Sequence, residues 1–188
     1  MALEFYVEQA DRSPQSGVAN ESIYAGELVH DDGDGVDVLA FADGTENVGL
    51  ARYDAEAMAA EWEEDVVEEV YDTGQRVQYQ PLEDSAILRV RTIEETTDGV
   101  TAAPSISHRD VVGIVDEADA DAPSSAGRVV EEGYVNDEND DTTTTTFNRS
   151  NSNFKAVGVA YRPGQRAGNA EDRYDHPVRV IMFSELKE

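Results

Sequence analysis

The acidic run from His30 to Asp37 is the first place in this sequence where the spacing of side chains could support chemistry. A calcium loop of the EF-hand type needs Gly at its sixth position and a bidentate Glu at its twelfth. With Gly35 at the sixth position, the twelfth is Phe41, so the pattern fails. The acidic run that begins at Asp137 also fails, because Thr142 stands where the glycine belongs. The Asp-Gly pairs of the first run instead predict a hairpin turn between two strands.

Nucleophiles and transition-metal ligands are scarce. The chain has no cysteine, which excludes thiolate nucleophiles and disulfides. The three histidines are His30, His108 and His176, and none stands in a His-x-His or His-x-x-x-His pair. A Ser-x-x-Lys motif, Ser184 to Lys187, lies in the last five residues, where we expect no pocket around it. The sequence therefore predicts no catalytic residue, no cofactor-binding residue and no metal site, and we expect a protein that is not an enzyme.

The charge of the chain excludes two classes of partner. It has 41 Asp and Glu against 14 Lys and Arg, which gives a formal net charge of -27 over 188 residues. Nucleic-acid binding needs clustered Lys and Arg, so we expect no direct contact with nucleic acid. An anionic membrane surface would repel the chain, and no apolar run is long enough to span a bilayer. The N-terminus carries no basic start followed by a long apolar stretch, so we expect synthesis as a soluble cytoplasmic chain.

The basic residues are divided unevenly, with twelve Arg and only two Lys, Lys155 and Lys187. Arg is the more weakly hydrated cation and pairs bidentately with carboxylates. An acidic surface with almost no Lys resembles that of proteins from haloarchaea and their viruses. At molar salt the Debye length is about 3 Å, which screens the self-repulsion of such a chain.

Short segments rich in β-branched and aromatic residues alternate with clusters of Gly, Asp and Pro. This pattern is typical of a mostly-β domain, and we expect a small β-barrel or β-sandwich. The expected strands are Leu3 to Glu8, Ile23 to His30, Val36 to Phe41, Val48 to Arg52, Arg76 to Gln80, Ala86 to Ile93, Val111 to Val115, Gly127 to Val135, Ala156 to Arg162 and Val178 to Phe183.

One helix is expected, from about Asp54 to Tyr71. Ala55, Met58, Trp62 and other apolar residues fall on one stripe at the helical period, and a glycine follows as a stop. We expect residues 1–188 to form one β-rich domain with an extended N-terminal segment of about residues 1–20.

The stretch from Asn136 to Asn153 is polar and of low complexity, with five consecutive threonines and Phe147 as its one large apolar residue. It is too long and too polar for an ordinary turn, so we expect an exposed loop. It is either a mobile loop with no role or an arm that orders against a neighbouring subunit. The N-terminal segment to Asn20 is a second candidate for strand exchange with neighbours.

The Gly-interrupted strands suggest a family. Val112 to Ile114, Ala126 to Val129, Val157 to Ala160 and the closing strand Val178 to Val180 form a pattern that resembles capsid decoration or head-accessory proteins of tailed viruses, here of a haloarchaeal host. The resemblance implies a virion protein, made in the host cytoplasm, that stabilises the capsid lattice as a decoration, turret or other head-accessory protein. Its implied partners are the major capsid protein and copies of itself, as a trimer or other symmetric oligomer.

Four arginines are candidates for contacts across such an interface: Arg89, Arg91, Arg162 and Arg179. Each could form a fork with a carboxylate of a neighbouring subunit, and pairing within the chain is an equal alternative. Two other functions stay open. One is a halophilic cellular β-domain that binds or scaffolds a larger complex, and the other is a hydrolase whose acidic pair is hidden among the many carboxylates.

Overall fold

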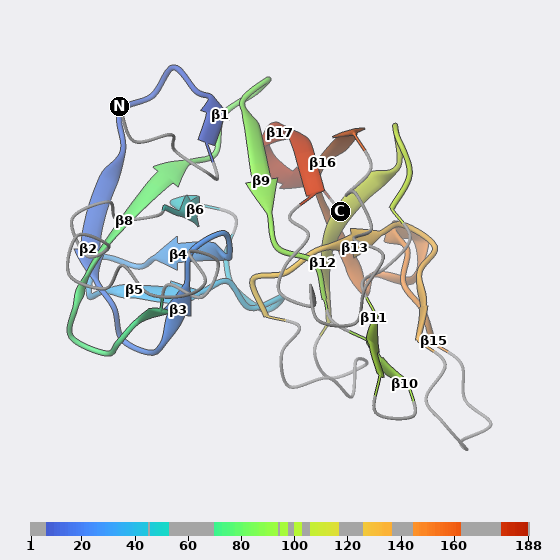
Figure 1. Cartoon of the computed structure of the whole chain (residues 1–188), viewed down its shortest axis with the longest axis horizontal. Helices are drawn as coiled ribbons and strands as arrows, with labels where there is room; N and C mark the ends of the chain where they lie inside the picture. Colours follow the sequence, from blue (N-terminus) through green and yellow to red (C-terminus); the bar gives the residue numbers. More distant parts are fainter. Residues whose placement is uncertain are drawn as a thin grey trace.

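The fold is mostly β and sandwich-like, with two antiparallel sheets that are not closed into a barrel (Figure 1). This confirms the fold class expected from the alternating sequence. One short 3-10 turn, Arg149–Asn151, is the helical element of the described residues. The computed structural model describes residues 7–44, 46–52, 70–93, 95–97, 100–102, 106–116, 126–136, 145–162 and 178–187.

The first sheet has five strands in the order β2-β8-β6-β4-β5. Their bounds are Gln15–Val18 for β2, Arg76–Pro81 for β8, Val48–Ala51 for β6, Leu28–Asp31 for β4 and Val36–Val38 for β5. The hairpin predicted from the Asp-Gly pairs is confirmed between β4 and β5. The Asp31 carboxylate accepts the Gly33 N–H at 2.9 Å, and the Asp32 carboxylate accepts the Asp34 N–H at 2.8 Å. These carboxylates therefore hold the turn.

The five-stranded sheet curls, so that the end of β2 returns to β5. Ala19 forms a parallel bridge with Val36, and the Asn20 N–H donates to the Val36 carbonyl at 3.0 Å. A Cβ atom on Gly17 would lie 2.5 Å from Val36 Cγ2, so the two strands can cross here only because Gly17 has no side chain. The curl encloses a small core: Ala19, Ile23, Val29, Val36, Ala51, Tyr71, Val77 and Tyr79.

The second sheet has six strands in the order β1-β9-β17-β16-β12-β13. Their bounds are Val7–Gln9 for β1, Ile87–Val90 for β9, Val178–Lys187 for β17, Phe154–Arg162 for β16, Val111–Val115 for β12 and Val130–Glu131 for β13. Two glycines of this sheet lie where backbones approach closely: a Cβ atom on Gly113 would overlap the Lys155 carbonyl, and one on Gly158 would overlap the Ile181 carbonyl. The ladder register shifts beside both glycines.

Three two-stranded ladders complete the described fold. They are β3 (Ile23–Tyr24) with β7 (Val70–Tyr71), β10 (Glu95–Thr97) with β11 (Val100–Ala102), and β14 (Val135–Asn136) with β15 (Thr145–Thr146). Two expected strands are each split by a glycine at positive φ. Gly26, at φ 90°, separates β3 from β4, and Gly133, at φ 93°, separates β13 from β14.

The expected helix is wrong at its C-terminal end. Residues 53–69 lie outside the described residues, but Val70 and Tyr71 form strand β7 and pair with β3. Tyr71 is buried in the small core, and its hydroxyl donates to the Arg52 carbonyl at 2.5 Å. Burial of this ring and pairing with β3 override the helical period of the preceding residues.

The expected N-terminal arm is also corrected. β1 pairs with β9 and β2 pairs with β8, so residues 7–9 and 15–18 are strands of this chain's own sheets. Residues 1–6 lie outside the described residues. The segment is extended as expected, but its strands already pair with β9 and β8 of the same chain.

The expected polar loop is anchored at its C-terminal end, which corrects its prediction as an exposed excursion. Phe147 is fully buried and stacks on Tyr134 with ring centroids 6.1 Å apart. The Asn151 and Asn153 side-chain amides donate to the Thr146 carbonyl at 3.0 and 3.2 Å. Phe147 covers a third core cluster with Ile93, Val115, Val130, Phe154 and Ala156. Residues 137–144 lie outside the described residues.

The two sheets share the largest apolar core. Leu28 and Leu50 enter it from the five-stranded sheet, and Leu88, Val112 and Val180 enter it from the six-stranded sheet. All five side chains are fully buried. Burial of a Leu or Val side chain contributes about 1.5–3 kcal/mol, so the shared core holds the sheets together.

A buried polar joint, which we call the seam cluster, lies where the two sheets meet; it consists of Tyr24, Glu27, Arg91 and Arg128. Arg128 Nε donates to Glu27 Oε1 at 3.0 Å, and the Tyr24 N–H donates to Glu27 Oε2 at 2.9 Å. The Arg91 and Arg128 guanidinium carbons lie 5.2 and 5.8 Å from the centroid of the Tyr24 ring, which places both cations over its face. Burial raises the pKa of the Glu27 carboxyl, and the Tyr24 N–H and the two guanidinium groups oppose that rise.

Truncation of the seam cluster should destabilise the protein strongly. We expect Arg128→Ala to lower the free energy of unfolding by about 3–5 kcal/mol, because it leaves the buried Glu27 carboxylate without its closest cation. Denaturant unfolding in molar KCl at neutral pH measures this loss. The control is Arg149→Ala, whose bridge to Glu132 at 2.7 Å involves an Arg149 side chain that is 41 % exposed. This variant should lose less than about 1 kcal/mol, and a larger loss for Arg149→Ala than for Arg128→Ala would contradict the account.

Phe147 should stabilise the fold far more than a residue of a free polar loop would. We expect Phe147→Ala to lower the free energy of unfolding by about 3–5 kcal/mol through the cavity that it leaves, and Phe147→Leu to lose clearly less. The same unfolding measurement compares the two variants. If Phe147→Ala unfolded with the same denaturant midpoint as wild type, this ring would not cover the third core cluster.

Candidate interaction surface

The outer face of the six-stranded sheet is the side that points away from the shared core. Along β17, Val178, Val180 and Met182 are buried in that core. Because side chains alternate along a strand, Arg179 and Ile181 point to the other side, and both are partly exposed. The side chains on this face are therefore partly exposed to solvent, while β17 is held in place by its residues that pack into the shared core.

Apolar side chains on the outer face form a continuous line across four strands. The ladder register places Ile87 of β9 opposite Ile181 of β17, Ile181 opposite Val159 of β16, and Val159 opposite Val111 of β12. Directly opposed residues in antiparallel strands have Cβ atoms about 4.5–5.5 Å apart, close enough to touch. All four side chains are partly exposed. We call these residues the apolar row.

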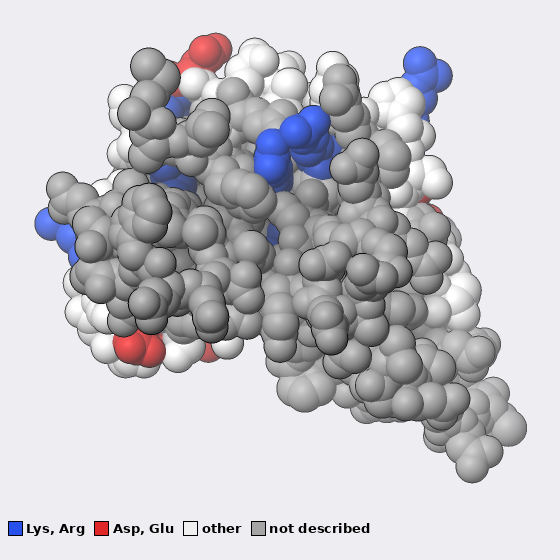
Figure 2. All heavy atoms as spheres, in the orientation of Figure 1, with Lys and Arg blue, Asp and Glu red and all other residues white. Residues whose placement is uncertain are grey.

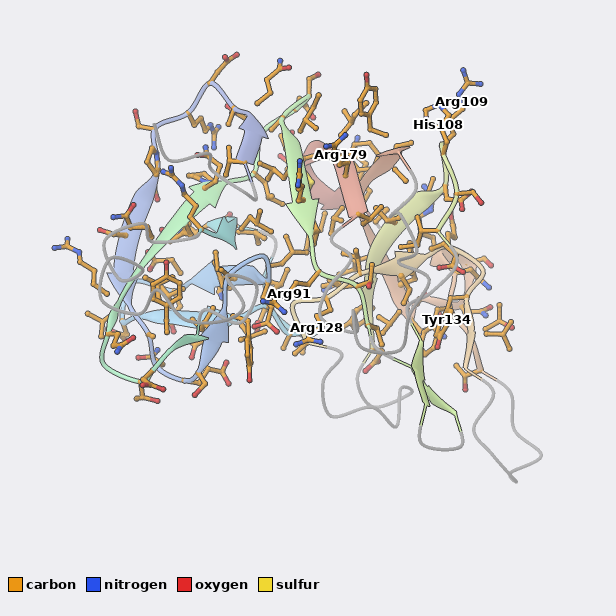
Figure 3. The ribbon with its side chains drawn as sticks, viewed as in Figure 1. Arg91, His108, Arg109, Arg128, Tyr134 and Arg179 are labelled. Carbon is orange, nitrogen blue, oxygen red and sulfur yellow. The ribbon has the colours of Figure 1, made fainter. Side chains whose placement is uncertain are left out.

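An arginine pair borders the apolar row. Arg89 of β9 lies directly opposite Arg179 of β17, and both side chains are partly exposed. Figure 2 shows Lys and Arg atoms gathered at the surface over β9 and β17, and Figure 3 labels Arg179 there. Like charges at opposed positions destabilise a sheet, so this arrangement favours carboxylates nearby. The backbone of Arg162 pairs with Arg179 on its other side, in β16.

The turn before β12 forms a rim beside this face. Arg109, at φ 76°, has a left-handed backbone, and its N–H donates to the Ala160 carbonyl at 2.8 Å. His108 Nδ1 bonds to the Tyr161 carbonyl at 2.6 Å, and the two rings meet edge to face with centroids 6.4 Å apart. Tyr161 is 39 % exposed, and Figure 3 shows His108 and Arg109 at the end of the molecule, directed outward. The turn is thus clamped to β16 while its cationic and aromatic groups stay at the surface.

The composition of this face is that of a protein-binding surface. Interfaces between proteins are enriched in aromatic residues and Arg, with apolar side chains at the centre and polar groups at the rim. The apolar row, the arginine pair and the Tyr161 rim follow this arrangement. In the described ranges, no group of three or more His, Asp and Glu could hold a metal ion, and no helix is long and apolar enough to cross a membrane.

The four arginines expected at an interface separate into different places. Arg89 and Arg179 lie together on the outer face, and the side chain of Arg162 lies outside what the structure describes. For Arg91 the structure favours the alternative, a contact within the chain: Arg91 is 2 % exposed, and its Nε donates to the Ala25 carbonyl at 2.6 Å. β9 ends at Val90, so the alternation that would place Arg91 beside Arg89 stops one residue too early.

Neither the apolar row nor Tyr161 was predicted from the sequence. Their signal was present in the alternation of β17, where Val178 and Val180 oppose Ile181. That alternation shows two faces but not which strands lie beside β17. Only the ladder register aligns Ile87, Val159 and Ile181 into one row.

In a second Ser-x-x-Lys motif, Ser152 to Lys155, the lysine has a structural role. The Lys155 ammonium donates to the Phe41 carbonyl and to the Asp43 carbonyl, the latter at 3.4 Å, and lies 4.7 Å from the centroid of the Phe41 ring. These contacts tie β16 to the loop after β5.

Comparisons with known proteins add no relative. No model of a known protein family matches the chain, and a search of curated protein sequences finds no match.

The outer-face arginines should contribute little to folding. We expect Arg179→Gln to change the free energy of unfolding by no more than about 0.5 kcal/mol, because the side chain is partly exposed. Arg91→Gln is the control: it removes the buried bond to the Ala25 carbonyl and should lose about 1–3 kcal/mol. Equal losses in denaturant unfolding would contradict the assignment of Arg179 to a binding surface.

Proposed function

We propose that this protein is a non-enzymatic structural protein of a haloarchaeal virus, and that it binds and stabilises the capsid lattice in high salt as a decoration, turret or other head-accessory protein. The observation that supports this function best is the outer face of the six-stranded sheet, where the apolar row lies beside Arg89 and Arg179. The resemblance of the Gly-interrupted strands to such proteins supports the same conclusion.

The chemistry of this face suits contacts made in molar salt. With a Debye length of about 3 Å, long-range attraction between charges is lost, and binding depends on apolar burial and on short Arg–carboxylate forks. The apolar row offers the first kind of contact, and the arginine pair offers the second. A capsid protein of the same environment carries many surface carboxylates, so it can supply the acceptors.

Repetition of a modest surface fits a lattice partner. A row of four partly exposed side chains and two arginines is small for a stable one-to-one complex, which usually buries about 1,600 Å² in total. On a symmetric shell the same contact occurs at every equivalent position, and copies that touch one another add avidity. Many weak contacts can thus hold neighbouring capsomers together against internal pressure.

Neutralisation of the arginine pair should weaken capsid binding. We expect the double variant Arg89→Gln/Arg179→Gln to bind at least about tenfold more weakly than wild type to purified source-virus capsids stripped of this protein. Co-sedimentation in molar KCl measures the bound fraction against concentration. The matched control, Arg12→Gln/Arg149→Gln, removes the same charge from exposed residues elsewhere and should bind as wild type does.

Two results would contradict the proposal. Equal affinity of the two double variants would show that the outer face is not the contact. Failure of the wild-type protein to bind capsids at all would favour the alternative function, a cellular β-domain that binds or scaffolds a larger halophilic complex.

A further inference from the structure

The four central strands of the six-stranded sheet are basic, although the chain is strongly acidic. β9, β17, β16 and β12 together contain five basic residues and one acidic residue, whereas the whole chain has 14 basic and 41 acidic residues. The acidic residue is Glu185, and the basic residues are Arg89, Lys155, Arg162, Arg179 and Lys187. Complementary charge selects protein partners, so a basic sheet on an acidic chain indicates a partner rich in carboxylates.

Strand β17 carries a line of side chains on the outer face of this sheet. Arg179, Ile181 and Phe183 occupy alternate positions, and all three are partly exposed. Alternate residues of a strand lie about 6.5 Å apart, so these three side chains span about 13 Å. Phe183 also packs against the third core cluster, which holds its ring in place.

Lys187 continues the line beyond Phe183. The ladder sets Met182 opposite Gly158 of β16. Lys187 lies opposite Ala156, so a bulge in β17 brings it only about one side-chain step further along β16. Its ammonium lies 4.6 Å from the centroid of the Phe183 ring. The line has a cation at each end and two apolar side chains between them, and we call it the β17 stripe: Arg179, Ile181, Phe183 and Lys187.

The neighbouring strands widen the β17 stripe. Arg89 of β9 lies opposite Arg179, so one end of the stripe holds two guanidinium groups. Ile87 of β9 and Val159 of β16 flank Ile181, which widens the apolar centre. Each guanidinium has five N–H donors, so it can bind a carboxylate in addition to its contacts within the chain. The stripe thus offers a carboxylate site on either side of an apolar surface.

The two ends of the stripe differ in the acidic residues beside them. Asp84 and Glu185 lie near the Lys187 end: the Asp84 carboxylate accepts the Ser184 N–H at 2.9 Å, and Glu185 is exposed. At the other end, neither β9 nor the part of β17 before Ser184 contains an acidic residue. We therefore expect the arginine end to bind a carboxylate more strongly than Lys187 does.

Given the capsid-binding function proposed above, we propose that the β17 stripe binds an extended acidic segment of the capsid protein. The first carboxylate of the segment bonds to the arginine pair. Two apolar side chains of the segment lie over Ile181 and Phe183, and a second carboxylate meets the Lys187 ammonium. In molar salt each carboxylate must touch its cation directly, because the Debye length is about 3 Å.

The spacing of the stripe favours an extended segment over a helix. Alternate side chains of an extended chain also recur at about 6.5 Å, so the first, third, fifth and seventh residues of the segment match the stripe step for step. One face of an α-helix repeats about every 5.4 Å and falls behind by about 1 Å at each step. The segment is therefore acidic, apolar, apolar and acidic at every second residue.

Peptides of this pattern test the proposal with the full chain in molar KCl. The probe is a synthetic seven-residue peptide with Glu at its first and seventh positions, Leu at its third and fifth, and Ser elsewhere. We expect saturable NMR shifts at Ile181 and Phe183, and a dissociation constant at least about tenfold lower than that of a matched peptide with Lys in place of Glu. A third peptide, with Ser in place of Leu, should bind at least about tenfold more weakly than the probe, because it loses apolar burial.

Charge reversal tests whether the arginine pair makes this selection. The double variant Arg89→Glu/Arg179→Glu should prefer the Lys peptide over the Glu peptide, an inversion that loss of folding cannot produce. The matched control, Arg12→Glu/Arg76→Glu, changes the same charge on exposed residues elsewhere and should keep the wild-type preference.

Equal affinity of the wild-type protein for the Glu and Lys peptides would overturn the proposal. A dimer that Arg89→Glu/Arg179→Glu dissolves would also overturn it, because the stripe would then hold a second copy of this chain. These failures are separate from that of the proposed function. Protein that binds capsids but not the Glu peptide contradicts only the partner segment, whereas preference for the Glu peptide without capsid binding contradicts the proposed function and leaves the acidic ligand of the stripe in place.

Discussion

The ion pair between Glu27 and Arg128 is the interaction on which the rest of the arrangement depends. It ties the loop before β4 to the residue pair before β13, so it holds the five-stranded sheet against the six-stranded one. Arg91, at the end of β9, adds a second tie through the Ala25 carbonyl. A buried ion pair is a weak source of net stability but a strict geometric constraint, because any other packing leaves charge buried without a partner. Because the seam cluster fixes how the sheets meet, one face of each sheet is buried in the shared core.

Burial of one face of each sheet determines which surfaces remain exposed to partners. The six-stranded sheet turns its second face outward, where one end is covered by Phe147 and Tyr134 and the other carries the apolar row and the arginine pair. The five-stranded sheet curls around its own small core, and Ala19 at the end of β2 bridges back to Val36 of β5. The apolar row and the arginine pair themselves contain no acidic residue, although the chain carries 41 Asp and Glu. In molar salt, uncharged and Arg-bearing patches are where association is least opposed by repulsion and hydration.

Local sequence patterns predicted the strands well and the tertiary contacts poorly. β12 occupies the expected Val111 to Val115, and the Asp-Gly turn forms the expected hairpin, because both depend on near neighbours. Tyr71 was expected to end a helix but pairs with Ile23 of β3, and Phe147 lies in a polar stretch but is buried against Tyr134 and the third core cluster. Arg91 illustrates the limit most clearly. Its carbonyl partner is 66 residues away, and the Glu27–Arg128 pair spans 101, distances over which no periodicity carries information.

The most direct measurement is to follow this protein by mass spectrometry through a density gradient of a lysate from its source culture, kept in high salt. If the protein binds a capsid lattice, it will migrate with the virus particles at a fixed ratio to the major capsid protein. Recovery only in the soluble fractions, with particles free of it, would contradict the central claim and point to a cellular complex instead.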